Sequence, residues 1–220
     1  IEIAGGKVIN NIVRNNEVIA DGQVWAVAAG IGVANFGEQY NSVIRNNKFY
    51  DNHTLSNAFS FGAGISVHVE GGYLLIENNE VYGNISESTG SYKALGAGID
   101  IETEYGTEPR IIIRNNYIHH NQVLCQASFG GGIYLVYGQG VEEVDPDSNV
   151  PVEIYNNIIS ENYSEDKGGG LAIWNMAPAY GFRQTVPNRL SVIYFMNAGL
   201  SVFFFRLIRF LFHFVSSFQL

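Results

Sequence analysis

Two short motifs alternate along this chain, and their spacing constrains the fold more than any other feature. Five Asn-Asn pairs each precede a glycine step that leads into an apolar segment. The pairs are Asn15-Asn16, Asn46-Asn47, Asn78-Asn79, Asn115-Asn116 and Asn156-Asn157, and the glycine steps lie at Gly30, Gly64, Gly98, Gly132 and Gly170. Successive glycine steps are 34, 34, 34 and 38 residues apart. A fixed period of this size is typical of stacked repeat architectures.

Each repeat contains three short segments with the alternation of a β-strand: one before the Asn pair, one after it, and one at the glycine step. Three strands that point away from one another cannot pair within one repeat, so each pairs with the repeats above and below. The sequence therefore predicts an all-β fold, a right-handed parallel β-helix of about five coils with three strands per coil. Coils about 4.8 Å apart bring equivalent Asn side chains into a hydrogen-bonded ladder.

The same register predicts two buried apolar columns, one on each side of the Asn corner. The first comprises Val13, Ile44, Ile76, Ile113 and Ile154, and the second comprises Val18, Phe49, Val81, Ile118 and Ile159. A third column, Arg45, Glu77 and Arg114, alternates in charge and predicts favourable pairing between neighbouring coils.

Two patterns, I-x-N-N-x-[VIF]-x-x-x-[ND] and G-x-G-[IL]-x-[IVL], cover roughly residues 5 to 175. In these motifs the chain resembles the right-handed parallel β-helix repeat superfamily, which includes pectate-lyase-like proteins. The resemblance implies that the outer face of the glycine strand carries a substrate groove, and that the protein is secreted or lies at the cell surface.

The net charge limits the classes of binding partner, and the distribution of charged residues divides the chain. The net charge of −9 argues against nucleic acid, because neutralising phosphates requires clustered Lys and Arg. All 21 acidic residues lie in residues 1–166, and residues 167–220 carry 5 basic residues and no acidic one. We therefore divide the chain into a β-helix domain, 1–183, and an atypical Phe-rich tail, 184–220. Because Ile1 opens inside a strand pattern, we expect the domain to be a fragment truncated upstream.

The tail leaves three alternatives open: a cap on the last coil, a membrane anchor, or a non-native sequence. A membrane span needs about 20 predominantly apolar residues. The longest apolar run, 190–205, is shorter and contains Asn197, so a membrane association is disfavoured except through 190–220.

Outward positions on the glycine strands gather acidic and aromatic residues in neighbouring coils. We assign Asp100, Glu102 and His68 as candidate catalytic residues, and Tyr134, Trp174, Glu70 and Glu104 as candidate substrate-binding residues. Alternate residues of a strand are about 6.6 to 6.8 Å apart. Carboxylates at about 6.5–9.5 Å suit an inverting glycoside hydrolase, so an enzyme of this kind would be a polysaccharide lyase or glycoside hydrolase. The N-T-D, D-D, H-G and R-x-K signatures of galacturonan hydrolases are missing.

Metal-binding patterns are weaker. Asp145, Asp147 and Asn149 resemble the opening of a Ca²⁺ loop, but Val150 and Asn156 replace its Gly and Glu. Ca²⁺ bound there, or by the acidic groove, is the one cofactor that the sequence suggests. Strand alternation sends only one ring of His119-His120 outward, which disfavours a two-histidine site.

These observations lead to one functional hypothesis and one alternative. The hypothesis is an extracellular or surface β-helix that presents an acidic and aromatic groove to a polysaccharide or cell-surface glycan, for binding or processing. The alternative is a purely structural, adhesin-type repeat without catalysis.

Overall fold

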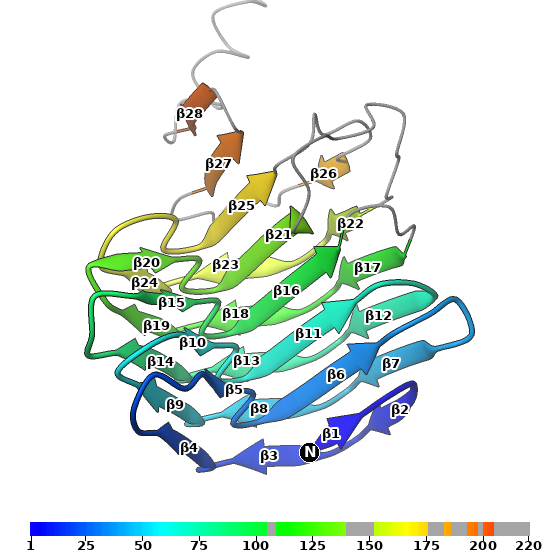
Figure 1. Cartoon of the computed structure of the whole chain (residues 1–220). Helices are drawn as coiled ribbons and strands as arrows, with labels where there is room; N and C mark the ends of the chain where they lie inside the picture. Colours follow the sequence, from blue (N-terminus) through cyan, green and yellow to red (C-terminus); the bar gives the residue numbers. More distant parts are fainter. Residues whose placement is uncertain (105–108, 140–151, 176–182, 186–192, 198–199, 205–220) are drawn as a thin grey trace, which may run out of the picture.

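The computed structural model describes residues 1–104, 109–139, 152–175, 183–185, 193–197 and 200–204, and all regular structure in these ranges is β-strand (Figure 1). The strands stack in parallel sheets that follow one another around each coil. The chain is a right-handed parallel β-helix, as the repeat predicts.

Five sheets surround the coil, and we name them A to E. Sheet A contains β1 (Glu2–Ile3), β6 (Ile31–Asn35), β11 (Ile65–Val69), β16 (Ile99–Glu104), β21 (Ile133–Gln139), β25 (Leu171–Asn175), β27 (Ile193–Asn197) and β28 (Leu200–Phe204). Sheet B contains β2 (Gly6–Ile9), β7 (Asn41–Arg45), β12 (Tyr73–Glu77), β17 (Arg110–Arg114), β22 (Val152–Tyr155) and β26 (Arg183–Thr185). Every neighbouring pair in these sheets is parallel except β27 with β28.

The other three sheets consist of shorter strands. Sheet C contains β3 (Ile12–Arg14), β8 (Lys48–Tyr50), β13 (Glu80–Tyr82), β18 (Tyr117–His119) and β23 (Ile158–Ser160). Sheet D contains β4 (Glu17–Ala20), β9 (His53–Ser56), β14 (Ile85–Ser88), β19 (Gln122–Leu124) and β24 (Tyr163–Ser164). Sheet E contains β5 (Ala26–Val27), β10 (Ser60–Phe61), β15 (Lys93–Leu95) and β20 (Ala127–Phe129). A coil thus has up to five strands instead of the three expected. The additional strands form sheets D and E, which the repeat pattern did not indicate.

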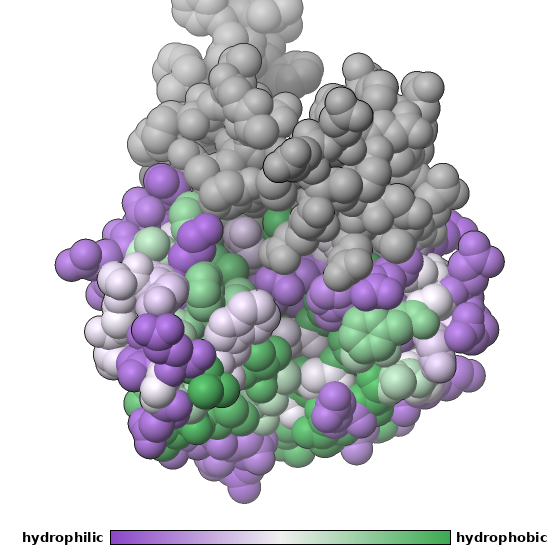
Figure 2. All heavy atoms as spheres, in the orientation of Figure 1, coloured by the Kyte–Doolittle hydropathy of each residue, from purple (hydrophilic) through white to green (hydrophobic). Residues whose placement is uncertain are grey.

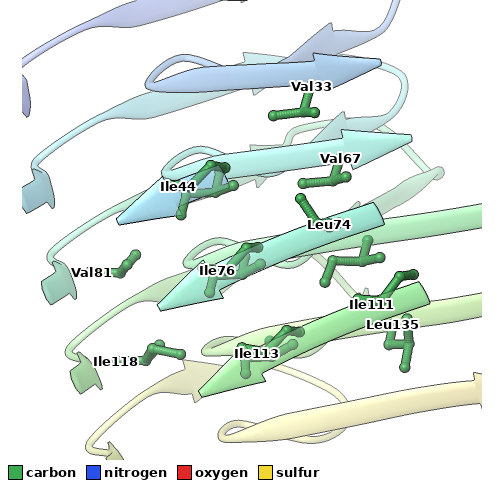
Figure 3. Close-up of a cluster of buried hydrophobic side chains, with 14 of the residues drawn as sticks. Val33, Ile44, Val67, Leu74, Ile76, Val81, Ile111, Ile113, Ile118 and Leu135 are labelled. Atoms are coloured by element: carbon green, nitrogen blue, oxygen red, sulfur yellow. The ribbon is translucent and has the colours of Figure 1, made fainter. Parts of the chain in front are cut away.

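The hydrophobic core fills the space between sheets A, B and C (Figure 3). Figure 3 shows Ile44, Ile76 and Ile113 above one another, and all three are fully buried. The predicted columns are confirmed from the second coil onward. In the first coil Val8, not Val13, pairs with Ile44.

The first-coil prediction is wrong because two Asn pairs lie five residues apart there. Val13 faces Phe49 in the second column, and Val18 faces Thr54 on sheet D. Asn11 therefore begins the ladder of the B/C corner, and Asn16 begins a second ladder at the C/D corner.

Asn79 illustrates how completely the ladder satisfies a buried amide. Its Oδ1 accepts hydrogen bonds from the backbone N–H and the Nδ2 of Asn47, at 2.9 and 3.0 Å. Its Nδ2 donates to the carbonyl of Ile44 at 2.9 Å and to Oδ1 of Asn116 at 3.0 Å. The preceding Asn78 has φ of 55°, a left-handed conformation that Asn tolerates.

The interior of sheets D and E is lined by hydroxyl groups. Ser60 Oγ donates to Thr54 Oγ1 at 2.9 Å, and Ser86 Oγ donates to Ser60 Oγ at 3.0 Å. These hydroxyls satisfy one another and the backbone beside a small apolar cluster that includes Ala94 and Val123, so this side of the coil is more polar than the core between sheets A, B and C.

In the tail, β27 pairs in parallel with β25 and β28 folds back on β27, so both strands extend sheet A. The described part of the chain contains no helix with the length and apolar character of a membrane span.

Candidate functional site

The corner between sheets E and A is tighter than the Asn corners. Gly96 has φ of 47°, and a Cβ there would lie 2.7 Å from the Cα of Asp100, four residues later. Glycine is required because the chain folds back on itself at this distance. In the first coil the two positions exchange residue types. Ala28 occupies the left-handed position, with φ of 58°, and the glycine, Gly32, lies four residues later.

This fold-back makes the outer faces of sheets E and A converge. Phe61, Leu95 and Phe129 from sheet E pack with Tyr134, Val136 and Ala172 from sheet A in a cluster separate from the core. We call this convergence the E/A angle. It comprises Trp25, Phe59, Phe61, Leu95 and Phe129 on the sheet E side and Asp100, Tyr134, Val136 and Ala172 on the sheet A side. On the outer face of sheet A, Glu102 and His68 lie two residues further from the corner than Asp100 and Ser66, and Glu70 follows the end of β11.

Aromatic side chains line the sheet E side of the angle in the lower coils. Trp25 is 60% exposed, and its ring centroid lies 5.6 Å from those of both Phe59 and Phe61. Phe59 contacts Tyr92 at 5.1 Å. On this face, Figure 2 shows apolar residues in green beside hydrophilic residues in purple. Sequence reasoning missed these aromatic residues because it did not anticipate sheet E.

The sheet A side carries a polar group of three residues. In the register His68 stands opposite Glu102, as predicted. His68 Nδ1 lies 3.8 Å from Glu102 Oε2, and its Nε2 lies 3.4 Å from Glu70 Oε1. The ring of Phe36 packs against His68 with centroids 5.4 Å apart. All three polar side chains are partly exposed, so they are available to a ligand.

Asp100 lies at the bottom of the angle, where only 1% of it is exposed. Its Oδ2 accepts a hydrogen bond from Ser66 Oγ at 3.4 Å, and its Oδ1 has no hydrogen-bond partner in the part of the chain described. Burial, and secondarily the charge of Glu102, raises the pKa of Asp100 well above its usual value. Burial likewise raises the pKa of Tyr134.

The expectation that the assigned residues of the glycine strands face solvent is therefore wrong for Asp100 and Tyr134. Their strand register is as predicted, with Asp100 opposite Tyr134. Both are buried because the glycine corner folds sheet E against them. Trp174 stands opposite Val136, and Glu104 opposite Gln139, in the backbone register; their side chains lie outside the described set.

The predicted Ca²⁺ ligands Asp145, Asp147 and Asn149 lie outside the described residues. Within the described ranges, no three His, Cys, Asp or Glu side chains are arranged to hold a metal.

Outer faces of sheets B and C carry charged columns. Glu77 lies between Arg45 and Arg114, with 2.8 Å from Arg45 Nε to Glu77 Oε1, so the predicted alternation of charge is confirmed. On sheet C, Lys48 Nζ lies 2.7 Å from Glu80 Oε2. The hydrogen bond from Lys48 lowers the pKa of Glu80, and burial lowers the pKa of His119.

The strand alternation expected across His119-His120 does not extend to His120. Strand β18 ends at His119, and His120 takes a left-handed φ of 56°, so it leaves the strand alternation. The two rings approach each other, and their Nδ1 atoms are 2.8 Å apart.

Comparison with known proteins agrees with this architecture. A family model described as the right-handed beta helix region matches residues 1–184. Neither the search of curated proteins nor that of solved structures gave a match. The matched region spans both Asn ladders and the E/A angle, and the chain belongs to the right-handed β-helix family.

Proposed function

We propose that this protein is secreted or displayed at the cell surface and binds a polysaccharide along the E/A angle. The observation that carries the proposal is the convergence of sheets E and A, with the exposed ring of Trp25 packed on Phe59 and Phe61 on one side. Further along the outer face of sheet A lie the partly exposed side chains of Glu102, His68 and Glu70. Aromatic faces suit the apolar faces of sugar rings, and Glu70, His68 and Glu102 suit sugar hydroxyl groups.

The repeat itself favours a polymeric ligand. Stacked coils place equivalent positions about 4.8 Å apart along the axis, and solenoids use extended concave surfaces for binding. A chain-like ligand that runs along the axis would contact sheet A and sheet E residues in several successive coils.

Burial of Asp100 favours binding over cleavage as the primary activity. A general acid must come within hydrogen-bond reach of the scissile oxygen. Asp100 has the raised pKa of a proton donor, but the fold-back at Gly96 covers it. Glu102 and His68 are the candidate catalytic residues that remain accessible.

A glycan array followed by affinity electrophoresis in soluble polysaccharides, with and without Ca²⁺, tests the proposal. Wild type should be retarded by at least one polysaccharide, and Trp25→Ala and Glu102→Gln should each weaken retardation about tenfold, which is the loss of about 1.4 kcal/mol. Tyr163→Ala is the matched control, since Tyr163 is comparably exposed but lies on sheet D.

Reducing-sugar release and unsaturated-product absorbance, measured on the same samples, detect hydrolase and lyase activity. Retardation without product supports a binding protein. No retardation of wild type by any polysaccharide, or equal losses in Trp25→Ala and Tyr163→Ala, would contradict the proposal.

The alternative is a structural module whose rigidity is its function. The two Asn ladders favour it, because they bind every coil to the next independently of any ligand. This alternative is supported if wild type binds no glycan and if Asn79→Ala clearly lowers the free energy of unfolding.

A further inference from the structure

Three acceptor motifs for N-linked glycosylation, Asn-x-Ser/Thr, lie at the C/D corner. They are Asn52-His53-Thr54, Asn84-Ile85-Ser86 and Asn162-Tyr163-Ser164. In a secreted protein this motif normally marks a surface loop, because the attached glycan is bulky and hydrophilic. Here the three asparagines are 0%, 0% and 8% exposed. The motif predicts accessible side chains, whereas the structure buries them.

The fold itself places the two polar residues of each motif. The asparagine belongs to the ladder of the C/D corner, and the next residue begins a strand of sheet D, namely β9, β14 or β24. Strand alternation turns the first residue of the strand outward and the second inward. The inward residue is therefore one of the hydroxyl residues that line the interior of sheets D and E. Ser164, for example, donates from Oγ to Ser128 Oγ at 2.9 Å.

Two other asparagines of the same ladder show that the motif depends on the inward residue. Asn16 and Asn121 make the same ladder contacts, but Val18 and Val123 follow them two residues later, so neither is an acceptor motif. The motif thus arises wherever a ladder asparagine precedes an inward hydroxyl. Its recurrence follows from the geometry of the coil and does not indicate glycan attachment.

The acceptor nitrogen already uses both of its hydrogens. Asn84 Nδ2 donates to the carbonyl of Phe49 at 3.0 Å and to Asn121 Oδ1 at 2.9 Å. Asn52 Nδ2 donates in the same way, to Val13 at 3.1 Å and to Asn84 Oδ1 at 2.9 Å. Glycosylation would replace one of these hydrogens by a sugar carbon. It would therefore leave a buried acceptor without its partner, which costs stability.

The space around these nitrogens is also filled, because the glycine steps of sheet A pack against them. A Cβ added to Gly64 would lie only 3.0 Å from Asn84 Nδ2, and one added to Gly132 only 2.8 Å from Asn162 Nδ2. Both separations are too short for an ordinary contact. Since the packed interior does not accept one additional carbon atom there, it does not accept a sugar ring.

We propose that N-glycosylation at Asn52, Asn84 or Asn162 and the native β-helix exclude each other. Transfer from a lipid-linked oligosaccharide breaks the bond between sugar C1 and the pyrophosphate carrier and joins C1 to Nδ2, whose proton leaves with the carrier phosphate. The folded chain does not present Nδ2 for this reaction, and a chain modified before it folds cannot stack its coils. Export of the native protein must therefore leave these asparagines unmodified, a consequence that rests on the proposed surface location.

Modification of the folded full chain is the first test. Purified protein is incubated with an oligosaccharyltransferase and a lipid-linked oligosaccharide, and mass spectrometry locates any glycan. Wild type should gain no glycan at the three asparagines. Ile158→Thr is the matched control, because it makes the exposed Asn156 of the B/C corner an acceptor, and Ile158 is itself 48% exposed. This variant should gain one glycan and keep its circular dichroism.

Modification before folding is the second test. The full chain, preceded by a cleavable secretion signal, is translated in the presence of microsomes, and a lectin separates glycosylated from unmodified chains. Wild-type chains that carry a glycan at Asn84 should lose the protease resistance that unmodified chains show. Ile158→Thr chains that carry a glycan only at Asn156 should remain resistant.

A variant without the motifs completes the second test. Thr54→Val, Ser86→Ala and Ser164→Ala together remove all three motifs and keep every asparagine of the ladder, and valine already follows the ladder asparagine in two coils. This variant should stay unmodified in microsomes and be protease-resistant.

The proposal is overturned if folded wild type gains a glycan at any of the three asparagines. It is equally overturned if glycosylated wild-type chains resist protease as well as unmodified chains do. A failure of polysaccharide binding at the E/A angle would leave both results unchanged, because neither measurement involves that surface.

Discussion

At the B/C corner, Asn79 uses both lone pairs and both amide protons of its side chain, and the same bonds recur in the neighbouring coils. At the E/A corner, Asp100 is as deeply buried but has one carboxylate oxygen without a partner. Both residues occupy repeated positions near a left-handed residue: Asn78 directly precedes Asn79, and Gly96 lies four residues before Asp100. The comparison teaches that the Asn corners hold the coil together, whereas the E/A corner retains an uncompensated polar group of the kind that accompanies functional sites.

The largest expected effect is at the glycine of the E/A corner. Gly96→Ala should destabilise by about 4 kcal/mol, of which about 1 reflects the positive φ and about 3 the overlap with Asp100. Urea unfolding measures the change. Gly22→Ala is the control, because Gly22 has φ of 80° but no atom within 4 Å of the added Cβ. A similar cost at both glycines would show that the E/A corner is not closely packed.

The Asn ladder comes next. Asn79→Ala should cost about 3 kcal/mol, because it leaves two donors on Asn47 and the carbonyl of Ile44 without partners. Asn11→Ala at the end of the ladder should cost only about 1 kcal/mol. Equal losses in denaturant titrations would contradict a ladder that depends on neighbours on both sides.

Asp100→Asn should stabilise the protein at neutral pH, on the order of 1 kcal/mol, because it removes an uncompensated buried charge. The folded-state pKa of Asp100 is raised, so folding favours the protonated form. Its contribution is therefore most favourable below the unfolded pKa and decreases as pH rises toward the folded value.

Unfolding curves of wild type and Asp100→Asn, collected from pH 3 to pH 8, should diverge as pH rises. The exposed Asp21→Asn variant should show no such divergence. Curves that stay parallel would mean that Asp100 is better solvated than its burial indicates.

The smallest effect is expected for the tail. A chain that ends at Arg183 should keep its β-rich circular dichroism and cooperative unfolding, because both Asn ladders and the E/A angle lie before this residue. It should also be more soluble, since exposed apolar patches promote association. Loss of cooperative unfolding would show instead that β27 is needed to complete sheet A.

The fold was predictable because apolar positions on sheets A, B and C recur with one period. Sheets D and E were not, because hydroxyl residues such as Thr54 and Ser60 face inward there while Leu55 and Phe61 face outward. Their alternation contradicts the rule that apolar side chains face the core. Some of these strands are also too short to show an alternation in the sequence, since β5 and β10 have two residues each.

The strand register of the candidate site was predictable from the sequence, but the burial of its side chains was not. A constant period places His68 opposite Glu102 and Asp100 opposite Tyr134. Burial of Asp100 depends on the direction in which the chain turns at Gly96, and the sequence motif does not specify that direction. The convergence of His119 and His120 likewise depends on the left-handed backbone at His120.

In both Asn ladders every amide points the same way: Nδ2 of one coil donates to Oδ1 of the next, from Asn11 to Asn47 and on to Asn79, and from Asn16 to Asn52 and on to Asn84. Aligned amide dipoles add along an axis, as peptide dipoles do in a helix. The two rows are parallel and run side by side through the solenoid, so their fields reinforce each other. The β-helix thus has an electrical polarity, with its first coils at the negative end, that any charged partner at either end would sense.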